Sequence, residues 1–371
     1  MKHNNEKLAS LSRRLDPLWW LIARALGLRR YSGPTAPRSI LLVELHLLGD
    51  MVMLVPLLRV LRRFHPNAHI GLMAGPWARE ILAGTGLVDE FITLRASWVA
   101  KGQGVPGIIG LLRAIRSSRA TNWDWGIDVR GDVRNALLLA LARAGRRIAY
   151  NFTGGAALLT DVVPDDGVLR HIIDHHAALA RYLHMPMTDE ERIPTLVFDK
   201  HTASEISVAR ASRLIGFHFG ASMALRRMPL EEARALVLSY QDQDDARLIL
   251  LDAPDVRALN TALLEQLPAT CAARVERWQG GLGELVAFLP LLDKFYAMDS
   301  GPAHLAAALG VDTTVFFGPH LSRAVRPMGR KVVVVERADV PCRPCDQHRC
   351  TNPHFQQCLT QVASLHSSSR S

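Results

Sequence analysis

Short apolar runs in the first half of the chain alternate with longer segments in which apolar residues recur every three or four positions. Such runs are typical of buried parallel strands, and such recurrence is typical of helices packed on one face. The expected strands are Ser39–Leu45, Ala68–Met73, Phe91–Leu94 and Trp125–Val129. The expected helices are Met51–Phe64, Gly75–Ala83, Ile108–Arg119, Asn135–Ala144 and Ile172–Leu183, with a turn at Gly49 and Asp50 and a loop at Asp161–Gly167. Strands alternating with helices predict a doubly wound parallel α/β domain.

The same alternation begins again after Pro186–Pro194, which we predict to connect two domains. The second set of strands is Arg213–His218, Arg247–Leu251, Phe295–Met298 and Thr313–Phe317. The second set of helices is Leu230–Tyr240, Asp255–Leu267, Leu282–Pro290 and a helix that begins after Ser300. The pattern therefore predicts an α/β protein with two Rossmann-like doubly wound domains that face a central cleft.

We divide the chain accordingly. Residues 1–37 form an N-terminal extension and linker, and residues 38–190 a first Rossmann-like domain. Residues 191–340 form a second Rossmann-like domain, and residues 341–371 a cysteine-rich segment and tail. Ligands of open α/β sheets bind beyond the carboxyl ends of the strands. The loops after Leu45, His218, Leu251 and Met298 are therefore the candidate binding loops.

The run from Asp299 to His304 is the most informative of these loops. Ser300, Gly301 and Pro302 suit a tight turn from a strand into a helix. The first N–H groups of such a helix lack partners, so they can hold an anion such as a diphosphate. The alternative is that Asp299 caps the helix and that His304 lies in the core.

Gly49 and Asp50 form a second candidate. An aspartate at the start of a helix after a buried strand can aim its carboxylate into the site, where it would act as a general base. The alternative is an ordinary helix cap. Arg130 and Arg134 follow another strand of the first domain, and they are either contacts to an acceptor or surface charges.

Composition narrows the class of partner. The chain has 371 residues, of which 49% are hydrophobic and 21% charged, and its net charge is +9. These values indicate a globular protein with a basic surface that favours anionic partners. The sequence has no nucleic-acid-binding motif and no dense basic run interleaved with aromatic residues, so we expect no nucleic-acid partner.

The apolar stretch Leu15–Leu28 is too short to span a bilayer, and no small-residue cleavage site of a signal peptide follows it. We therefore expect a cytoplasmic protein. Arginines flank the stretch at positions 13, 14, 29 and 30, and Trp19 and Trp20 lie within it. It suits a helix on an anionic membrane surface, which would make the protein peripheral at the inner face of the cytoplasmic membrane. The alternative is a helix packed on the body of the protein.

Several motifs together resemble glycosyltransferase family 9, the bacterial lipopolysaccharide heptosyltransferases. Asp50 and Pro56 are spaced as in the family's first helix, and Asp299–His304 resembles its Asp-Thr-Gly-x-x-His motif. The resemblance extends from about Arg38 to Cys358. Other segments that resemble family motifs are His218–Ser222, Met228-Pro229, Asp128–Asp132 and Phe316–Pro319. Their order and spacing carry the resemblance.

The resemblance implies a GT-B fold and an inverting transfer. The sugar would move from a nucleotide-sugar donor, typically ADP-heptose, to a lipid-linked saccharide such as the lipopolysaccharide core. Asp50 would be the general base, and Asp299 would bind hydroxyl groups of the donor sugar. Ser300, Gly301 and His304 would lie near the diphosphate and sugar. Ser222 with Arg226 or Arg227 would neutralise the leaving group, and Asp255 would reach the ribose. Because arginine and a helix N-terminus supply positive charge, no cofactor or catalytic metal would be required.

Departures from the family pattern keep alternatives open. Glu44 stands where the family often has lysine, and Phe219 and Met228 replace proline and tryptophan. A transferase that uses another nucleotide sugar is one alternative. A catalytically silent nucleotide-sugar-binding protein is another. A sugar-nucleotide epimerase of related fold is disfavoured by the motifs around Asp50 and Asp299.

Four cysteines lie close together near the C-terminus, at Cys342, Cys345, Cys350 and Cys358. Four thiolates can hold a structural zinc ion tetrahedrally, although this spacing is tighter than in common zinc ribbons. Reduced packing thiols or a redox-labile cluster are the alternatives, since disulfides are rare in a reducing cytosol. Cys271 lies outside the cluster and is expected to be buried.

Overall fold

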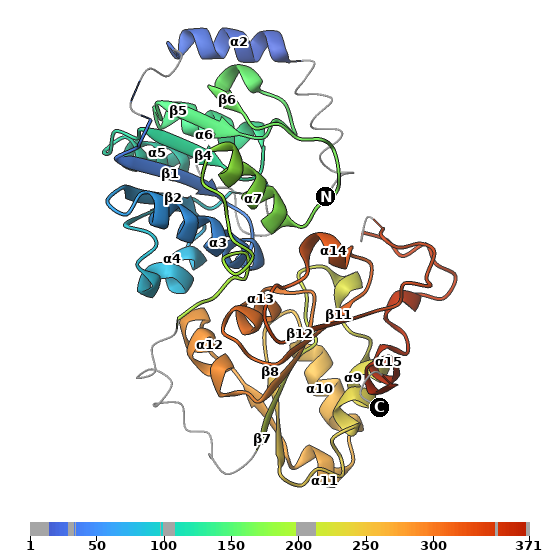
Figure 1. The fold of residues 1–371 in the computed structure, drawn as a ribbon. Helices are drawn as coiled ribbons and strands as arrows, with labels where there is room; N and C mark the ends of the chain where they lie inside the picture. Colours follow the sequence, from blue (N-terminus) through green and yellow to red (C-terminus); the bar gives the residue numbers. More distant parts are fainter. Residues whose placement is uncertain are drawn as a thin grey trace. The chain divides into compact units, whose positions relative to one another are not determined.

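The chain folds as two compact units, Met1–Arg192 and Ile193–Ser371. This computed structural model describes residues 15–28, 33, 35–96, 98, 108–197, 213–345 and 348–368 (Figure 1). Arg13, Arg14, Arg29 and Arg30, which flank the predicted membrane-surface helix, lie outside the described residues.

The first unit contains a six-stranded parallel sheet in the order β3-β2-β1-β4-β5-β6. Its strands are β1 (Ser39–Glu44), β2 (His69–Ala74), β3 (Glu90–Thr93), β4 (Trp125–Asp128), β5 (Arg146–Ala149) and β6 (Asp161–Val162). Strand β1 is buried along its whole length and lies between β2 and β4. β5 was not predicted, and Asp161–Val162 is a strand where a loop was expected. Both errors fall on short strands at one edge of the sheet.

Helices α2 (Asp16–Ala25), α3 (Leu48–Phe64), α4 (Trp77–Leu82), α5 (Ile108–Ser118), α6 (Val133–Leu141) and α7 (Ile172–Tyr182) complete this unit. The predicted turn at Gly49 and Asp50 is wrong, because both residues lie in the first turn of α3. Leu47 is the residue before the helix and has extended backbone.

Helix α2 packs on the body of the first unit through one of its faces. Trp19, Ile22 and Ala23 contact a cluster formed with Val133 and Leu158. The expectation of a packed helix therefore holds for this face. The opposite side of α2 remains exposed and apolar.

The second unit has a sheet of the same kind, in the order β12-β11-β10-β7-β8-β9. Its strands are β7 (Arg213–His218), β8 (Ala246–Leu251), β9 (Val275–Trp278), β10 (Lys294–Met298), β11 (Thr313–Phe317) and β12 (Val332–Glu336). Its helices are α9 (Leu230–Leu238), α10 (Arg257–Gln266), α11 (Ala269–Ala272), α12 (Leu282–Phe288), α13 (Gly301–Ala308), α14 (Ser322–Val325) and α15 (Val362–Ser368). Numbered from the first strand of each unit, both sheets have the Rossmann order 3-2-1-4-5-6. The predicted class of two Rossmann-like α/β domains is confirmed.

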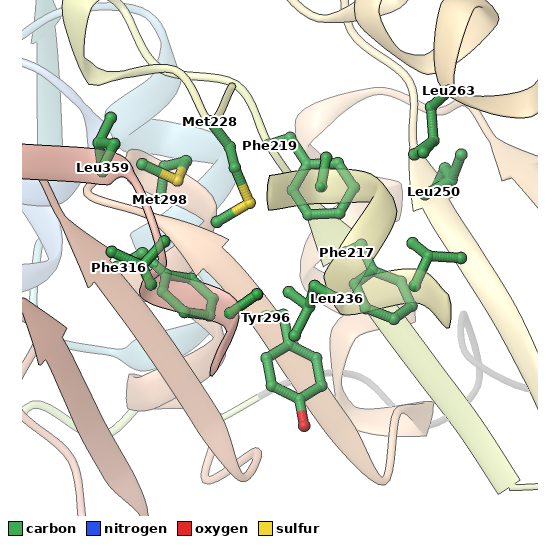
Figure 2. Packing of buried hydrophobic residues seen from close by; sticks show 14 of the residues in the cluster. Phe217, Phe219, Met228, Leu236, Leu250, Leu263, Tyr296, Met298, Phe316 and Leu359 are labelled. Carbon is green, nitrogen blue, oxygen red and sulfur yellow. The ribbon is translucent and has the colours of Figure 1, made fainter. Parts of the chain in front are cut away.

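The core of the second unit is rich in aromatic and methionine side chains (Figure 2). Phe217 stacks on Tyr296, and the Tyr296 hydroxyl lies 2.7 Å from the Tyr240 hydroxyl, so each buried phenol has a partner. Leu359 and Val362, from the segment assigned to a separate cysteine-rich region, pack in the same core. The C-terminal segment is therefore built into this unit.

Candidate functional site

The two sheets place the candidate residues at equivalent positions. In this strand order the order of the strands reverses between the first and fourth strands, and ligands bind at the carboxyl ends there. In the first unit these strands are β1 and β4, followed by Asp50 and Arg130. In the second unit they are β7 and β10, followed by Ser222 and Asp299. Each unit thus carries a cluster of charged residues, described separately below.

Asp50 lies in the first turn of α3 and accepts two hydrogen bonds, one on each carboxylate oxygen. Its Oδ2 accepts from the Leu47 backbone N–H at 3.2 Å, and its Oδ1 accepts from Arg130 Nη1 at 3.0 Å. The carboxylate therefore caps its own helix, as the structural alternative supposed. Its side chain is 26% exposed, so the group also remains accessible.

Arg130 is the central cation of the first cluster. Its side chain is only 6% exposed. Burial lowers the pKa of Arg130, but the charges of Asp50, Glu44 and Asp128 outweigh burial and raise it above its usual value. Arg130 is therefore a buried ion-pair partner of the predicted base Asp50, and it is not a surface charge.

Glu44, the departure from the family pattern, is fully buried at the end of β1. Its Oε1 accepts from the His46 backbone N–H at 2.9 Å and lies 3.0 Å from His46 Nδ1. Burial raises the pKa of Glu44, but the Arg130 charge and the hydrogen bonds from His46 lower it to about 2. The negative charge at this position is thus balanced within the cluster.

Asp128 and Asp132 hold the loop between β4 and α6. Asp128 accepts from the Arg130 N–H, the Asp132 N–H and the Asn135 side-chain amide. Burial raises the pKa of Asp128 to about 7, although these hydrogen bonds offset part of its effect. Arg134 pairs with Asp132, and its guanidinium carbon lies 5.3 Å from the centroid of the Trp98 ring. Arg134 thus lies in the first turn of α6, directly after the loop that carries Arg130, and has its own partner.

The second cluster is centred on Asp299, which follows β10 and is 6% exposed. Its Oδ2 accepts from Arg226 Nη1 at 2.9 Å and lies 2.7 Å from His320 Nδ1. Burial raises the pKa of Asp299, but the hydrogen bond and charge of His320 and the charges of Arg226 and His304 lower it to about 2. The low pKa means that Asp299 is ionised at neutral pH. Both contacts are made by Oδ2, and Oδ1 takes part in neither of them.

Arg226 connects Asp299 to the loop after β7. Its Nη2 donates to the exposed Ser222 Oγ at 2.6 Å. Arg227 instead donates from Nε to the Ala221 carbonyl at 3.1 Å. Of the two arginines that the sequence offered, the structure places Arg226 beside Asp299 and Ser222.

Helix α13 begins at Gly301, directly after Ser300, as predicted. Ser300 precedes the helix in extended conformation, and its buried Oγ has no hydrogen-bond partner among the described residues. Gly301 and Pro302 are the first two helical residues. His304 is 7% exposed and lies close enough to lower the pKa of Asp299. An unsatisfied hydroxyl at a helix start is suited to an anionic or hydroxyl-bearing ligand.

Asp255 lies beside the loop after β7, and it precedes α10 rather than opening that helix. A Cβ on Gly220 would come within 2.7 Å of Asp255 Oδ2, so the absence of a side chain permits this close approach. Burial lowers the pKa of nearby His218 to about 4, although the Asp255 charge acts in the opposite direction. Asp255 is thus at the carboxyl edge, as predicted.

The four clustered cysteines line one cavity of the second unit. Their thiols suit a soft metal, but among the described residues no three His, Cys, Asp or Glu side chains are arranged to hold an ion. The structural zinc therefore stays a prediction. Cys271 is buried in the core as expected. Burial raises the pKa of Cys358 to about 11.

Sequence reasoning missed His320 and His46. His320 follows the Phe316–Pro319 motif and lies 2.7 Å from Asp299. Its position immediately after a recognised strand-end motif was a signal that could have identified it. His46 lies in the candidate loop after Leu45. Its ring is held in place by the contact with the buried Glu44, and no pattern in the sequence indicates that contact.

Comparison with known proteins places these clusters in a family context. Residues 111–356 match the family described as glycosyltransferase family 9 (heptosyltransferase). The chain is 24% identical over 311 residues to lipopolysaccharide heptosyltransferase 2 of Escherichia coli (strain K12), covering 80% of this chain and 87% of that relative.

Two solved structures have the same fold. The structure of E. coli ADP-heptose lps heptosyltransferase II has a TM-score of 0.70 at 21% identity, covering 90% of this chain and 100% of that chain. A glycosyl transferase family 9 protein from Veillonella parvula has a TM-score of 0.69 at 21% identity, covering 81% and 86%. These likenesses show the GT-B fold.

Proposed function

Because this chain belongs to glycosyltransferase family 9, we propose that it transfers heptose from ADP-heptose to a saccharide of the lipopolysaccharide core, with inversion at the anomeric carbon. The observation that carries the proposal is the cluster of Asp299, Arg226 and Ser222 at the start of α13. Another nucleotide sugar as donor and a silent nucleotide-sugar-binding protein remain the competing functions.

The second cluster has the chemistry that a nucleoside diphosphate sugar needs. Arg226 presents a guanidinium to phosphate oxygens, and the first N–H groups of α13 add positive potential. Both would stabilise the charge that develops on the leaving diphosphate without a metal ion. Oδ1 of Asp299 and Oγ of Ser300 would accept or donate hydrogen bonds to donor hydroxyls, and Asp255 would reach the ribose.

The first cluster has the chemistry that activates an acceptor hydroxyl. A carboxylate has about four acceptor positions, so Asp50 can accept a further hydrogen bond beyond those from Leu47 and Arg130. In the proposed step, the acceptor oxygen forms a bond to the anomeric carbon as the bond to the diphosphate breaks. Asp50 takes the proton, and Arg130 keeps the carboxylate oriented throughout.

We also propose that the acceptor is lipid-linked and that α2 brings the protein to an anionic membrane surface. The exposed apolar side chains of α2 include Trp20 and Leu21, at 68% and 64% exposed. No helix in the described part of the chain is long and apolar enough to cross a bilayer. The location that we propose is peripheral, at the cytoplasmic face of the membrane.

The test compares the two clusters in one experiment. Asp50→Asn should abolish transfer but leave ADP-heptose binding nearly unchanged, whereas Arg226→Gln should weaken donor binding. Calorimetry with ADP-heptose and a transfer assay on extracted core lipid measure both. Unchanged turnover of Asp50→Asn removes Asp50 from the mechanism. Wild-type protein that binds ADP-heptose without transferring it to any core lipid favours the silent-binder function.

A further inference from the structure

The cysteine-lined cavity lies against loops that carry donor-site residues. Besides Cys342, Cys345, Cys350 and Cys358, its lining includes Leu225 and Pro319. Leu225 is the neighbour of Arg226, and Pro319 the neighbour of His320. The cavity volume is about 20 Å³, which is room for about one water molecule. The cavity is partly open to solvent, since three of its four thiols are partly exposed, so a group added to one of them lies against the cavity wall.

Gln356 joins the cysteine segment to the loop that carries Arg226. Its Nε2 lies 3.2 Å from the Leu225 carbonyl and 3.4 Å from the Arg227 carbonyl and donates to both. Its backbone N–H donates to Cys350 Sγ at 3.4 Å. One residue therefore contacts both a cavity thiol and the carbonyls on either side of Arg226.

Arg343 makes the corresponding connection to the loop that carries His320. Its Nε donates to the Gly318 carbonyl, and its Nη2 donates to the His320 carbonyl at 3.3 Å. The Cys345 N–H also donates to the Pro319 carbonyl at 3.2 Å. Because Arg343 pairs with Glu336 of β12 at 2.6 Å, this connection is anchored in the sheet.

We propose that the cavity is a thiol-modification site that controls donor binding, with Gln356 and Arg343 as positioning residues. This inference rests on the proposed donor site. Cys342, Cys345 and Cys350 are partly exposed, so they are the groups that react, whereas Cys358 is buried. The co-reactant is a small disulfide. A thiolate attacks one of its sulfur atoms, a protein–sulfur bond forms, the original S–S bond breaks, and the second half leaves as a thiolate.

A group added to Cys345 or Cys350 lies beside the hydrogen bonds from the Cys345 N–H to Pro319 and from the Gln356 N–H to Cys350, so it disturbs the contacts that hold the two loops. Arg226 and His320 then move away from Asp299, and the positive charge that would hold the diphosphate is no longer in position. Modification therefore weakens donor binding without touching a donor contact. The same loss of position follows when Gln356 cannot donate its hydrogen bonds.

Two matched variants separate this role from a general structural one. Gln356→Met keeps the side-chain length but removes both donated hydrogen bonds. Gln361→Met is the control, because Gln361 lies in the same segment, is exposed and also has a positive φ (62° against 52° for Gln356). We expect Gln356→Met to weaken ADP-heptose binding about tenfold, with the KM for the acceptor unchanged. Gln361→Met should bind as the wild type does.

Methyl methanethiosulfonate tests the modification itself, because it transfers a methylthio group to a thiolate and releases methanesulfinate. Peptide mass spectrometry identifies the modified cysteines, and calorimetry measures ADP-heptose binding before and after treatment. We expect at least a tenfold loss of affinity in the wild type and none in a Cys342→Ser/Cys345→Ser/Cys350→Ser variant. Confirmed modification with unchanged affinity overturns the proposal.

Hydrogen exchange distinguishes failure of this inference from failure of the proposed function. Modification should speed amide exchange in residues 222–227 and 317–320 whether or not ADP-heptose is the donor. Faster exchange in a protein that binds no ADP-heptose contradicts the donor assignment but supports the coupling. Unchanged exchange after confirmed modification contradicts the coupling, even if the wild type binds ADP-heptose tightly.

Discussion

At the scale of single residues, Arg130 determines whether the first cluster can exist. It is buried between Asp50, with which it forms an ion pair, and Glu44, whose pKa its charge helps to lower. A buried charge without a partner is far less stable than a buried pair. The glutamate at position 44 is therefore tolerated because Arg130 and His46 lie beside it.

Replacing Arg130 with glutamine should leave two carboxylates without their shared cation. We expect a loss of about 3–5 kcal/mol in the free energy of unfolding, together with loss of transfer activity. Arg130→Lys should recover part of the stability but less of the activity, because lysine lacks the planar fork of donors. Urea unfolding and the transfer assay measure both. Arg134→Gln is the control, and an equally large effect there would contradict a special role for Arg130.

Asp299 should make stability depend on pH at the acid end. Its pKa is about 2 in the folded protein against 3.8 for the ordinary side chain. Its contribution is therefore present above about pH 4 and is lost as the pH falls towards 2. Asp299→Asn should cost on the order of 2 kcal/mol at pH 7 and progressively less below pH 4.

Urea unfolding at several pH values tests the Asp299 prediction. Asp312→Asn is the control, because its carboxylate is 43% exposed and pairs with Lys294. A stability difference for Asp299→Asn that is constant from pH 7 to pH 3 would show that the ion pair is not its source.

At the scale of elements, His176 connects α7 to α3. It is fully buried, and its Nδ1 lies 3.1 Å from the Met53 carbonyl. Burial lowers the pKa of His176 to about 4, with Arg130 acting in the same direction and Glu44 against it. The folded protein therefore holds this ring neutral at pH values where the unfolded chain protonates it.

The contact between α3 and α7 should consequently weaken in mild acid. The contribution of His176 is complete above about pH 6.5, the ordinary pKa of the ring, and decreases as the pH falls from there to about 4. His176→Gln should make the free energy of unfolding less dependent on pH in this range. The exposed His184 provides the control, as His184→Asn, because asparagine tolerates its positive φ of 60°. An unchanged pH dependence in His176→Gln would be evidence against this account.

The elements also show how far the sequence could predict the fold and the site. Strands with long apolar runs, such as β1 and β7, were predicted almost to the residue, since burial on both faces leaves a continuous signal. β5, β6 and β9 lack that signal because they are short or partly exposed, whereas β12 has a run of four valines and was nevertheless missed. Asp50 and Asp299 were found because motifs marked them.

The partners of those two residues were harder to find. Arg130 reaches Asp50 from 80 positions away, and Arg226 reaches Asp299 from 73 positions away. Both arginines were candidates, but no local pattern shows that they pair with these carboxylates. Only the sheet order brings the strand ends together, so the ion pairs needed the structure.

At the scale of the whole molecule, charge and exposed apolar surface occur in the same segment. Residues 1–30 contain seven lysines and arginines and only two acidic residues. Within this stretch, the exposed side chains of α2 include Leu18, Trp20 and Leu21. One face of α2 packs on the body of the protein, so the second apolar face is left exposed to solvent. An anionic bilayer complements both properties, because it offers negative charge outside and hydrocarbon beneath.

Vesicle binding tests this proposal on the full chain. We expect the wild type to sediment with vesicles that contain phosphatidylglycerol, and less so with phosphatidylcholine alone or at high salt. Trp20→Ser/Leu21→Ser should reduce binding at least about tenfold, since burying one large apolar side chain is worth about 1.5–3 kcal/mol. Both side chains point away from the packed face, so unfolding should not change.

The matched control for this experiment is Ile109→Ser/Leu112→Ser on α5, where the two side chains are 64% and 58% exposed. That pair removes a similar amount of exposed apolar surface from a helix outside the basic N-terminal stretch. If both double variants lose binding equally, the attraction is a general property of exposed apolar surface and α2 has no special role. If neither loses binding, the net charge of +9 is sufficient by itself, and the apolar face of α2 does not enter the bilayer.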